Sequence, residues 1–154
     1  KKKKKGKLPG SVLFICNLNA IRSPMAEGLM KALYPGRIFT QSAGVTPGDP
    51  DPFAAEVMGE VGIDIASHMP RGVDELDDLT SYDVIVALTP EAKEAAEGAT
   101  RSAATEVEYW DVIDPLATPT GGSRERRLVA YRELRDQLKR LIEKRFGRTE
   151  RRVG

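Results

Sequence analysis

Residues 12–29 read VLFICNLNAIRSPMAEGL, and this stretch decides which fold the sequence predicts. Its first four residues are apolar and favour a buried strand, whereas the run from Pro24 to Leu29 is typical of the start of a helix. Between them lies a short loop that begins at Cys16, the only cysteine of the chain, and reaches Arg22. The stretch therefore predicts a strand, a loop and a helix, with a thiol at the end of the strand.

Such a loop is suited to binding a tetrahedral oxyanion. Its backbone N–H groups and the helix dipole favour a thiolate at Cys16, and they equally favour phosphate. Arg22 can offer a planar fork of donors to two oxygens of the same anion. The alternative is a structural cysteine beside a surface arginine, because the spacing C-x5-R alone recurs by chance. The strand before the loop and Ser23-Pro24 after it, which we expect to cap and open the helix, favour the phosphate site.

Composition narrows the classes of protein that the chain can belong to. Its 154 residues, 40% of them hydrophobic, suffice for one core, and 24 basic against 23 acidic side chains give no reason to expect nucleic acid as a partner. One cysteine excludes an internal disulfide and a metal site of several thiolates, and a single histidine, His68, argues against zinc. We therefore expect neither a metal nor a cofactor.

The chain reads as one domain between two basic ends. We expect residues 1–10, which begin with five lysines, to form a disordered basic arm, residues 11–147 a single domain, and residues 148–154 a basic tail. No apolar run is long enough to cross a membrane, and the stretch from Ser11 to Ile15 is too short for a signal peptide. A cytoplasmic, reducing location is the expectation, and the oligomeric state stays open.

Strands and helices are predicted to alternate along the chain. The predicted strands are 11–15, 37–42, 82–88 and 106–110. The predicted helices are 23–33, 53–61, 90–97 and 123–145, and the last carries an apolar stripe of Leu128, Tyr131, Leu134, Leu138 and Ile142. This alternation predicts a doubly wound α/β domain with a parallel sheet, in which ligands bind beyond the carboxyl ends of the strands. The loop at Cys16 and the segment around Asp114 both follow such ends.

Hydrolysis of a phosphate ester through a thiolate needs a nucleophile, stabilisation of the transferring oxygens and an acid for the leaving alcohol. Cys16 and Arg22 fit the first two roles. Asp114 is the candidate for the third, because it follows the last strand and precedes Pro115, which biases it toward an extended conformation. An Asp-Pro pair is also an ordinary turn. The lone His68 in an irregular segment is interpreted as structural.

With these residues in view, the chain resembles the low-molecular-weight protein tyrosine phosphatase family, which includes related arsenate reductases, as a divergent bacterial-type member. The resemblance rests on residues 12–27, Ser42-Ala43-Gly44, residues 62–71, residues 82–85 and residues 111–115. It implies a three-layer α/β sandwich in which helices flank a four-stranded parallel sheet, the phosphotyrosine phosphatase I-like fold. It also implies a metal-independent hydrolase acting through a cysteinyl-phosphate intermediate.

The resemblance also assigns roles to individual residues. Cys16 is the nucleophile, Arg22 clamps the phosphate, and Asp114 acts first as acid and then as base for the attacking water. Ser23 stabilises the thiolate, and Asn19 and Ser42 belong to the network that holds the loop. The predicted phosphate-binding loop consists of Asn17, Leu18, Asn19, Ala20, Ile21, Arg22 and Ser23.

The chain departs from the family pattern near the predicted mouth of the site. Leu18 stands where the family has glycine, and Ile21 replaces a second cysteine. Leu88-Thr89 replaces Met-Asp, and Leu116-Ala117 replaces the aromatic residue after Asp-Pro. These changes predict a modest selectivity for phosphotyrosine, with partner recognition through loops 46–53 and 116–122.

Three functions remain open at this point. The first is a phosphatase, acting on a phosphorylated protein or a small phosphomonoester. The second is an arsenate reductase that draws on thiols of other molecules, since the chain has no further cysteine. The third is a non-catalytic phosphate- or phosphoprotein-binding module, against which the retention of all three candidate catalytic residues argues.

Overall fold

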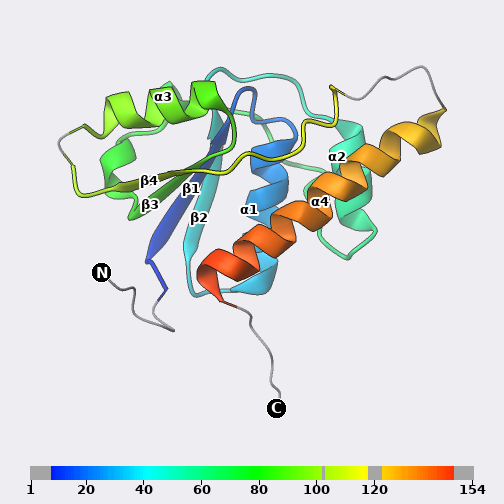
Figure 1. Ribbon diagram of the computed structural model, residues 1–154, viewed down its shortest axis with the longest axis horizontal. Coiled ribbons are helices and arrows are strands. Elements are labelled where there is room, and N and C mark those ends of the chain that lie inside the picture. The colour runs from blue at the N-terminus through cyan, green and yellow to red at the C-terminus, as the bar shows by residue number, and fades with distance from the viewer. Residues whose placement is uncertain (1–7, 102, 118–122, 148–154) are drawn as a thin grey trace, which may run out of the picture.

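The computed structural model describes residues 8–101, 103–117 and 123–147 (Figure 1). Most of the predicted basic arm and the whole predicted tail lie outside these residues. Gly10, inside the predicted arm, is tied to the sheet: its N–H donates to the Asp83 carboxylate at 2.8 Å, and its carbonyl accepts from Phe39 N–H at 2.9 Å.

The centre of the molecule is a parallel sheet in the order β2-β1-β3-β4. Its strands are β1 (Ser11–Cys16), β2 (Phe39–Gly44), β3 (Val84–Ala87) and β4 (Glu106–Tyr109). All three neighbouring pairs are parallel, and Cys16 pairs with Gly44 at the carboxyl edge. The predicted fold class, a four-stranded parallel sheet flanked by helices, is confirmed.

Helices cover both faces of the sheet (Figure 1). α1 (Arg22–Leu33), α2 (Pro52–Gly59) and α4 (Arg124–Phe146) lie on one face, and α3 (Pro90–Ala99) lies on the other. Because alternate side chains of a strand point to opposite faces, Val12 and Phe14 pack under the three helices, whereas Leu13 and Ile15 pack under α3. The predicted apolar stripe of α4 is buried along its whole length.

Several predicted boundaries were wrong. The second strand is Phe39–Gly44 rather than 37–42, because residues 34–38 form a turn with Gly36 at a φ of 72°. The second helix ends at Gly59, and a turn through Gly62, at a φ of 80°, follows it. Two short 3₁₀ turns, Val73–Glu75 and Leu79–Ser81, were not predicted.

Ser23 is not the cap of α1, contrary to the sequence prediction. The helix is preceded by Ile21, whose side chain cannot accept a hydrogen bond, and Ser23 lies within the first turn. The Ser23 hydroxyl is engaged with Cys16 and Asn19 instead of with the free N–H groups of the helix.

Candidate functional site

The loop between β1 and α1 turns its carbonyl groups away from its own interior. The carbonyls of Cys16, Asn17 and Leu18 accept hydrogen bonds from the N–H groups of Val45, Thr46 and Gly48, at 2.9, 3.0 and 2.9 Å. Within the described residues, no N–H group of residues 17–21 donates to a protein acceptor. A run of free N–H groups on a tight loop next to a helix start can hold a tetrahedral anion.

Gly44 lets the end of β2 approach this loop closely. A Cβ at this position would lie 2.7 Å from the Asn19 nitrogen, 2.7 Å from the Leu18 carbonyl carbon and 2.6 Å from the Thr46 oxygen. All three are backbone atoms, which cannot rotate away. Only glycine therefore fits at the point where β2 supports the loop.

Asn19 is the residue that holds the loop in shape. Its φ of 57° is left-handed, which asparagine tolerates better than most residues, and it is fully buried. Its Nδ2 group donates to the hydroxyls of Ser23 and Ser42, both at 2.9 Å. Its Oδ1 atom accepts from the Arg71 backbone N–H at 2.9 Å and lies 3.0 Å from His68 Nε2. Four partners thus fix one side chain.

Ser23 connects this network to the thiol. Cys16 is 3% exposed, and its Sγ atom lies 3.0 Å from the Ser23 hydroxyl oxygen. That oxygen accepts a hydrogen bond from Asn19 Nδ2, and the hydroxyl donates to the carbonyl of Ala43 at 3.3 Å. The single hydroxyl proton of Ser23 can turn from this long contact toward sulfur when a thiolate forms.

Arg22 begins α1 and is partly buried. It forms no ion pair with any carboxylate in the part of the chain that the structure describes. Its guanidinium group is therefore available to an anion held by the loop.

The segment that leaves β4 crosses toward α2 and α4 (Figure 1). Asp114 belongs to this segment between β4 and α4. Its side chain is exposed, and its Oδ1 atom accepts from Leu116 N–H at 3.0 Å. Burial raises the pKa of the Tyr131 phenol, and its hydrogen bond to Asp51 and the charges of Asp51 and Asp114 raise that pKa further. Asp114 thus lies within electrostatic reach of Tyr131, whose hydroxyl donates to Asp51 Oδ2 at 2.8 Å.

Two leucines that the sequence predicts at the mouth of the site have exposed side chains. Leu18 is 48% exposed and Leu116 is 54% exposed. Gly48 gives Leu18 its space, because a Cβ at position 48 would lie 2.8 Å from the Leu18 Cβ. The predicted recognition loop 116–122 is described only through Ala117.

Three aromatic residues lie in the predicted recognition loop 46–53 or at the end of β4: Phe53, Tyr109 and Trp110. Trp110 is engaged in the core, where its ring packs against Phe14 and Phe146 with centroids 5.9 and 6.4 Å apart. Phe53 packs edge-on against Tyr131 and is covered by Arg127. Tyr109, 38% exposed at the end of β4, remains the most accessible of the three.

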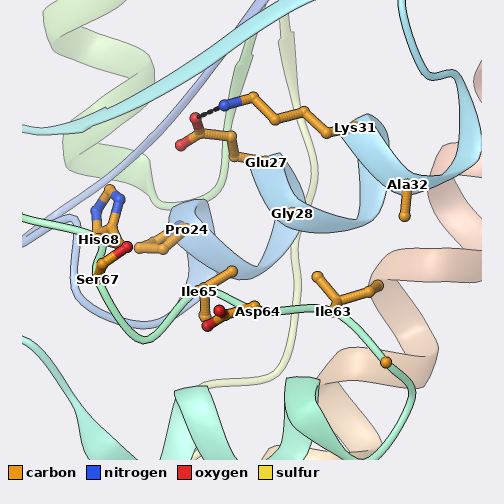
Figure 2. A pocket seen from close by; sticks show the side chains of 11 residues that line it. Pro24, Glu27, Gly28, Lys31, Ala32, Ile63, Asp64, Ile65, Ser67 and His68 are labelled. Carbon is orange, nitrogen blue, oxygen red and sulfur yellow. Dashed lines mark hydrogen bonds and ion pairs between the residues drawn. The ribbon is translucent and has the colours of Figure 1, made fainter.

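A groove of about 440 Å³ lies behind the loop, between α1 and residues 62–68 (Figure 2). Two of its lining residues touch the loop network: His68 contacts Asn19, and the Glu27 carboxylate accepts from the Ser42 hydroxyl at 2.5 Å. Because Asn19 O and Oδ1 are both acceptors, His68 Nε2 carries a proton. The structural role predicted for His68 is therefore one of supporting the loop.

The described residues contain neither a cluster of three or more metal-ligating side chains nor a helix long and apolar enough to span a membrane.

Comparison with known proteins agrees with this geometry. The family model of low molecular weight phosphotyrosine protein phosphatases matches residues 11–152. Arsenate reductase 2 of Staphylococcus epidermidis is 31% identical over 133 residues, which cover 86% of this chain and 93% of that protein. The chain belongs to the low-molecular-weight phosphotyrosine protein phosphatase family.

Two solved structures share the fold. One is a YwlE arginine phosphatase mutant with a phosphorylated active-site serine, with a TM-score of 0.68, 28% identity, and coverage of 86% of this chain and 90% of that one. The other is the Erwinia amylovora tyrosine phosphatase AmsI, with a TM-score of 0.71, 22% identity, and coverage of 92% and 94%. Its low identity supports the fold alone.

Proposed function

We propose that the chain is a metal-independent phosphomonoester hydrolase, of the protein tyrosine phosphatase type, that works through a phosphorylated Cys16. The observation that carries this proposal is the loop itself, where a buried thiol at its start lies 3.0 Å from the Ser23 hydroxyl and the N–H groups of residues 17–21 donate to no acceptor among the described residues. Phosphorylation of an active-site serine in the YwlE mutant supports covalent transfer in a relative.

In the proposed mechanism the Cys16 thiolate attacks phosphorus in line with the leaving oxygen. The N–H groups of residues 17–22 and the Arg22 fork bind the three equatorial oxygens, where charge accumulates in the transition state. Asp114 gives a proton to the leaving alcohol. It then takes a proton from the water that attacks the phosphocysteine, which releases phosphate and restores the thiolate.

Arsenate reduction is a second candidate, because the Staphylococcus epidermidis relative carries that name. Arsenate has the shape of phosphate, so the same loop can bind it. Its reduction consumes two electrons, which a pair of thiols supplies on forming a disulfide. Since Cys16 is the only cysteine, the second thiol must come from another molecule.

One set of assays separates the two candidates. Hydrolysis of 4-nitrophenyl phosphate is measured without added metal for the unaltered chain and for Cys16→Ser, with vanadate as competitor. Arsenate reduction is measured in parallel with glutathione and with glutaredoxin. The proposal expects vanadate-sensitive hydrolysis that Cys16→Ser abolishes, and arsenate reduction much slower than hydrolysis. Fast thiol-dependent reduction without hydrolysis would replace the proposal with the second candidate.

A further inference from the structure

Asn17, the residue after the nucleophile, carries a side chain whose direction is fixed by Thr89. Thr89 Oγ1 lies 2.7 Å from Asn17 Oδ1, and the same hydroxyl accepts from Ala92 N–H at 3.0 Å as the cap of α3. Thr89 is 3% exposed. The buried Thr89 hydroxyl needs an acceptor for its proton, because a buried donor without an acceptor destabilises the fold.

This arrangement settles the orientation of the Asn17 carboxamide. The Thr89 oxygen already accepts from α3, so its single proton goes to Asn17 Oδ1. The reverse orientation would turn the NH₂ group toward Thr89 and leave the buried hydroxyl proton without a partner. The carboxamide oxygen therefore points to Thr89, and the NH₂ group is turned away from it; the Asn17 residue is partly exposed.

The NH₂ group is available to a ligand. Within the described residues Asn17 Nδ2 donates to no protein acceptor. The Asn17 backbone carbonyl is bound to Thr46 on the β2 side of the loop, while its side chain is bound on the β3 side. The residue is thus anchored from both sides of the loop, directly after the nucleophile in the chain.

We propose that Asn17, oriented by Thr89, determines substrate specificity by donating a hydrogen bond to an oxygen of the leaving group. The inference rests on the proposed phosphatase function and names its substrate class: phosphomonoesters that carry a hydroxyl or carbonyl oxygen close to the ester oxygen. Thr89 is a positioning residue in this account, since it acts only through Asn17.

The test uses pairs of substrates that differ only in that oxygen. The ortho and meta isomers of hydroxymethylphenyl phosphate are compared with the corresponding ethylphenyl phosphates, whose leaving groups have similar size and acidity. The measured quantity is the ratio of kcat/KM within each pair, because a general loss of stability or of loop geometry lowers both members alike.

Asn17→Ala is expected to lower this ratio by about three- to tenfold in at least one isomeric pair, the range of a single neutral hydrogen bond. Thr89→Val should lower it similarly, and Thr89→Ser, which keeps the hydroxyl, should restore it. The double variant should be no worse than Asn17→Ala. Thr100→Val, which alters the buried threonine at the other end of α3, should leave the ratio unchanged.

Two outcomes would contradict the inference in different ways. If the unaltered chain hydrolyses the substrates and Asn17→Ala leaves every ratio unchanged, the specificity role of Asn17 is wrong while the phosphatase function stands. If the unaltered chain hydrolyses neither these substrates nor any other phosphomonoester, the proposed function is wrong and the inference is wrong with it.

Discussion

The proposed reaction needs three single residues in different roles: Cys16, Arg22 and Asp114. Replacing Cys16 with Ser should abolish turnover, because a serine hydroxyl supplies almost no alkoxide at neutral pH. Binding of phosphate or vanadate should persist, since the N–H groups of the loop are untouched. Calorimetric titration of the variant with vanadate checks this. Turnover that persists above a contaminant control, without added metal, would contradict the role of Cys16.

Arg22 offers a graded test of the anion clamp. Arg22→Ala should lose both turnover and oxyanion affinity, whereas Arg22→Lys keeps the charge but loses the planar fork and should be intermediate. Phosphate dissociation constants measured by calorimetric titration of the three chains give the order directly. Equal affinities in all three would mean that Arg22 points away from the anion.

The role of Asp114 as an acid should be visible in how the rate depends on the leaving group. Asp114→Asn removes a proton donor worth about 10²–10⁴-fold in rate. The loss in kcat/KM, which reports the phosphorylation step, should be large for alkyl phosphates and small for 4-nitrophenyl phosphate, whose leaving group needs little protonation. A series of aryl phosphates of graded leaving-group pKa tests this. The same loss across the series would assign Asp114 a structural role instead.

At the scale of elements, the contact between the end of β2 and the loop should tolerate no side chain. Gly44→Ala places a Cβ against three backbone atoms, so we expect a destabilisation of about 1–3 kcal/mol and weaker phosphate binding. Gly59→Ala is the matched control, because a Cβ there meets nothing within 4 Å. Thermal unfolding with and without phosphate compares the two. A Gly44→Ala chain as stable and as phosphate-binding as the control would contradict this packing.

A second element-scale prediction concerns the ion pairs between α2 and α4. Hydrogen bonds from Arg132 and Arg135 lower the pKa of Glu60 from 4.5 to about 2. Because the pKa of Glu60 is lower in the folded chain than in the unfolded chain, the ionised carboxylate stabilises the fold at any pH well above 4.5. This stabilisation is lost as the pH falls from about 4.5 toward 2 and the carboxylate is protonated. Glu60→Gln should therefore lower Tm at pH 7, by an amount that shrinks across this window. A constant difference in Tm would mean that the pair does not titrate.

The sequence predicted the elements better than it predicted how they meet. Apolar periodicity gave the four strands and the stripe of α4, because burial on one face imposes a visible pattern. The sequence prediction for Ser23 was wrong, because a serine before a proline is typical of a helix cap. The competing partners of its hydroxyl, Cys16 and Asn19, become visible only in three dimensions. The links of Thr89 to Asn17 and of Glu27 to Ser42 join distant residues and leave no local signal. In the sequence, Thr89 stood out only as part of the pair Leu88-Thr89 that replaces Met-Asp of the family pattern.

At the scale of the whole molecule, the shape of the mouth should set a modest selectivity. If the exposed leucines at positions 18 and 116 line the mouth, they would shield a ring from water without stacking on it, and stacking adds about 0.5–1.5 kcal/mol. The specificity constant for phosphotyrosine peptides should therefore exceed those for phosphoserine, phosphoarginine and small alkyl phosphates by less than about a thousandfold. A larger ratio would require an aromatic wall, and Tyr109→Ala would then be the first variant to examine.

If phosphate passes through Cys16, the phosphorylated intermediate can be trapped. Asp114→Asn forms the intermediate readily from 4-nitrophenyl phosphate but lacks the base for its hydrolysis, so the phosphorylated chain should accumulate. Rapid quenching followed by mass spectrometry is expected to find one phosphoryl group per chain, on the peptide that contains Cys16, with a burst of nitrophenol of equal size. Steady hydrolysis with no burst and no phosphorylated cysteine would contradict the account.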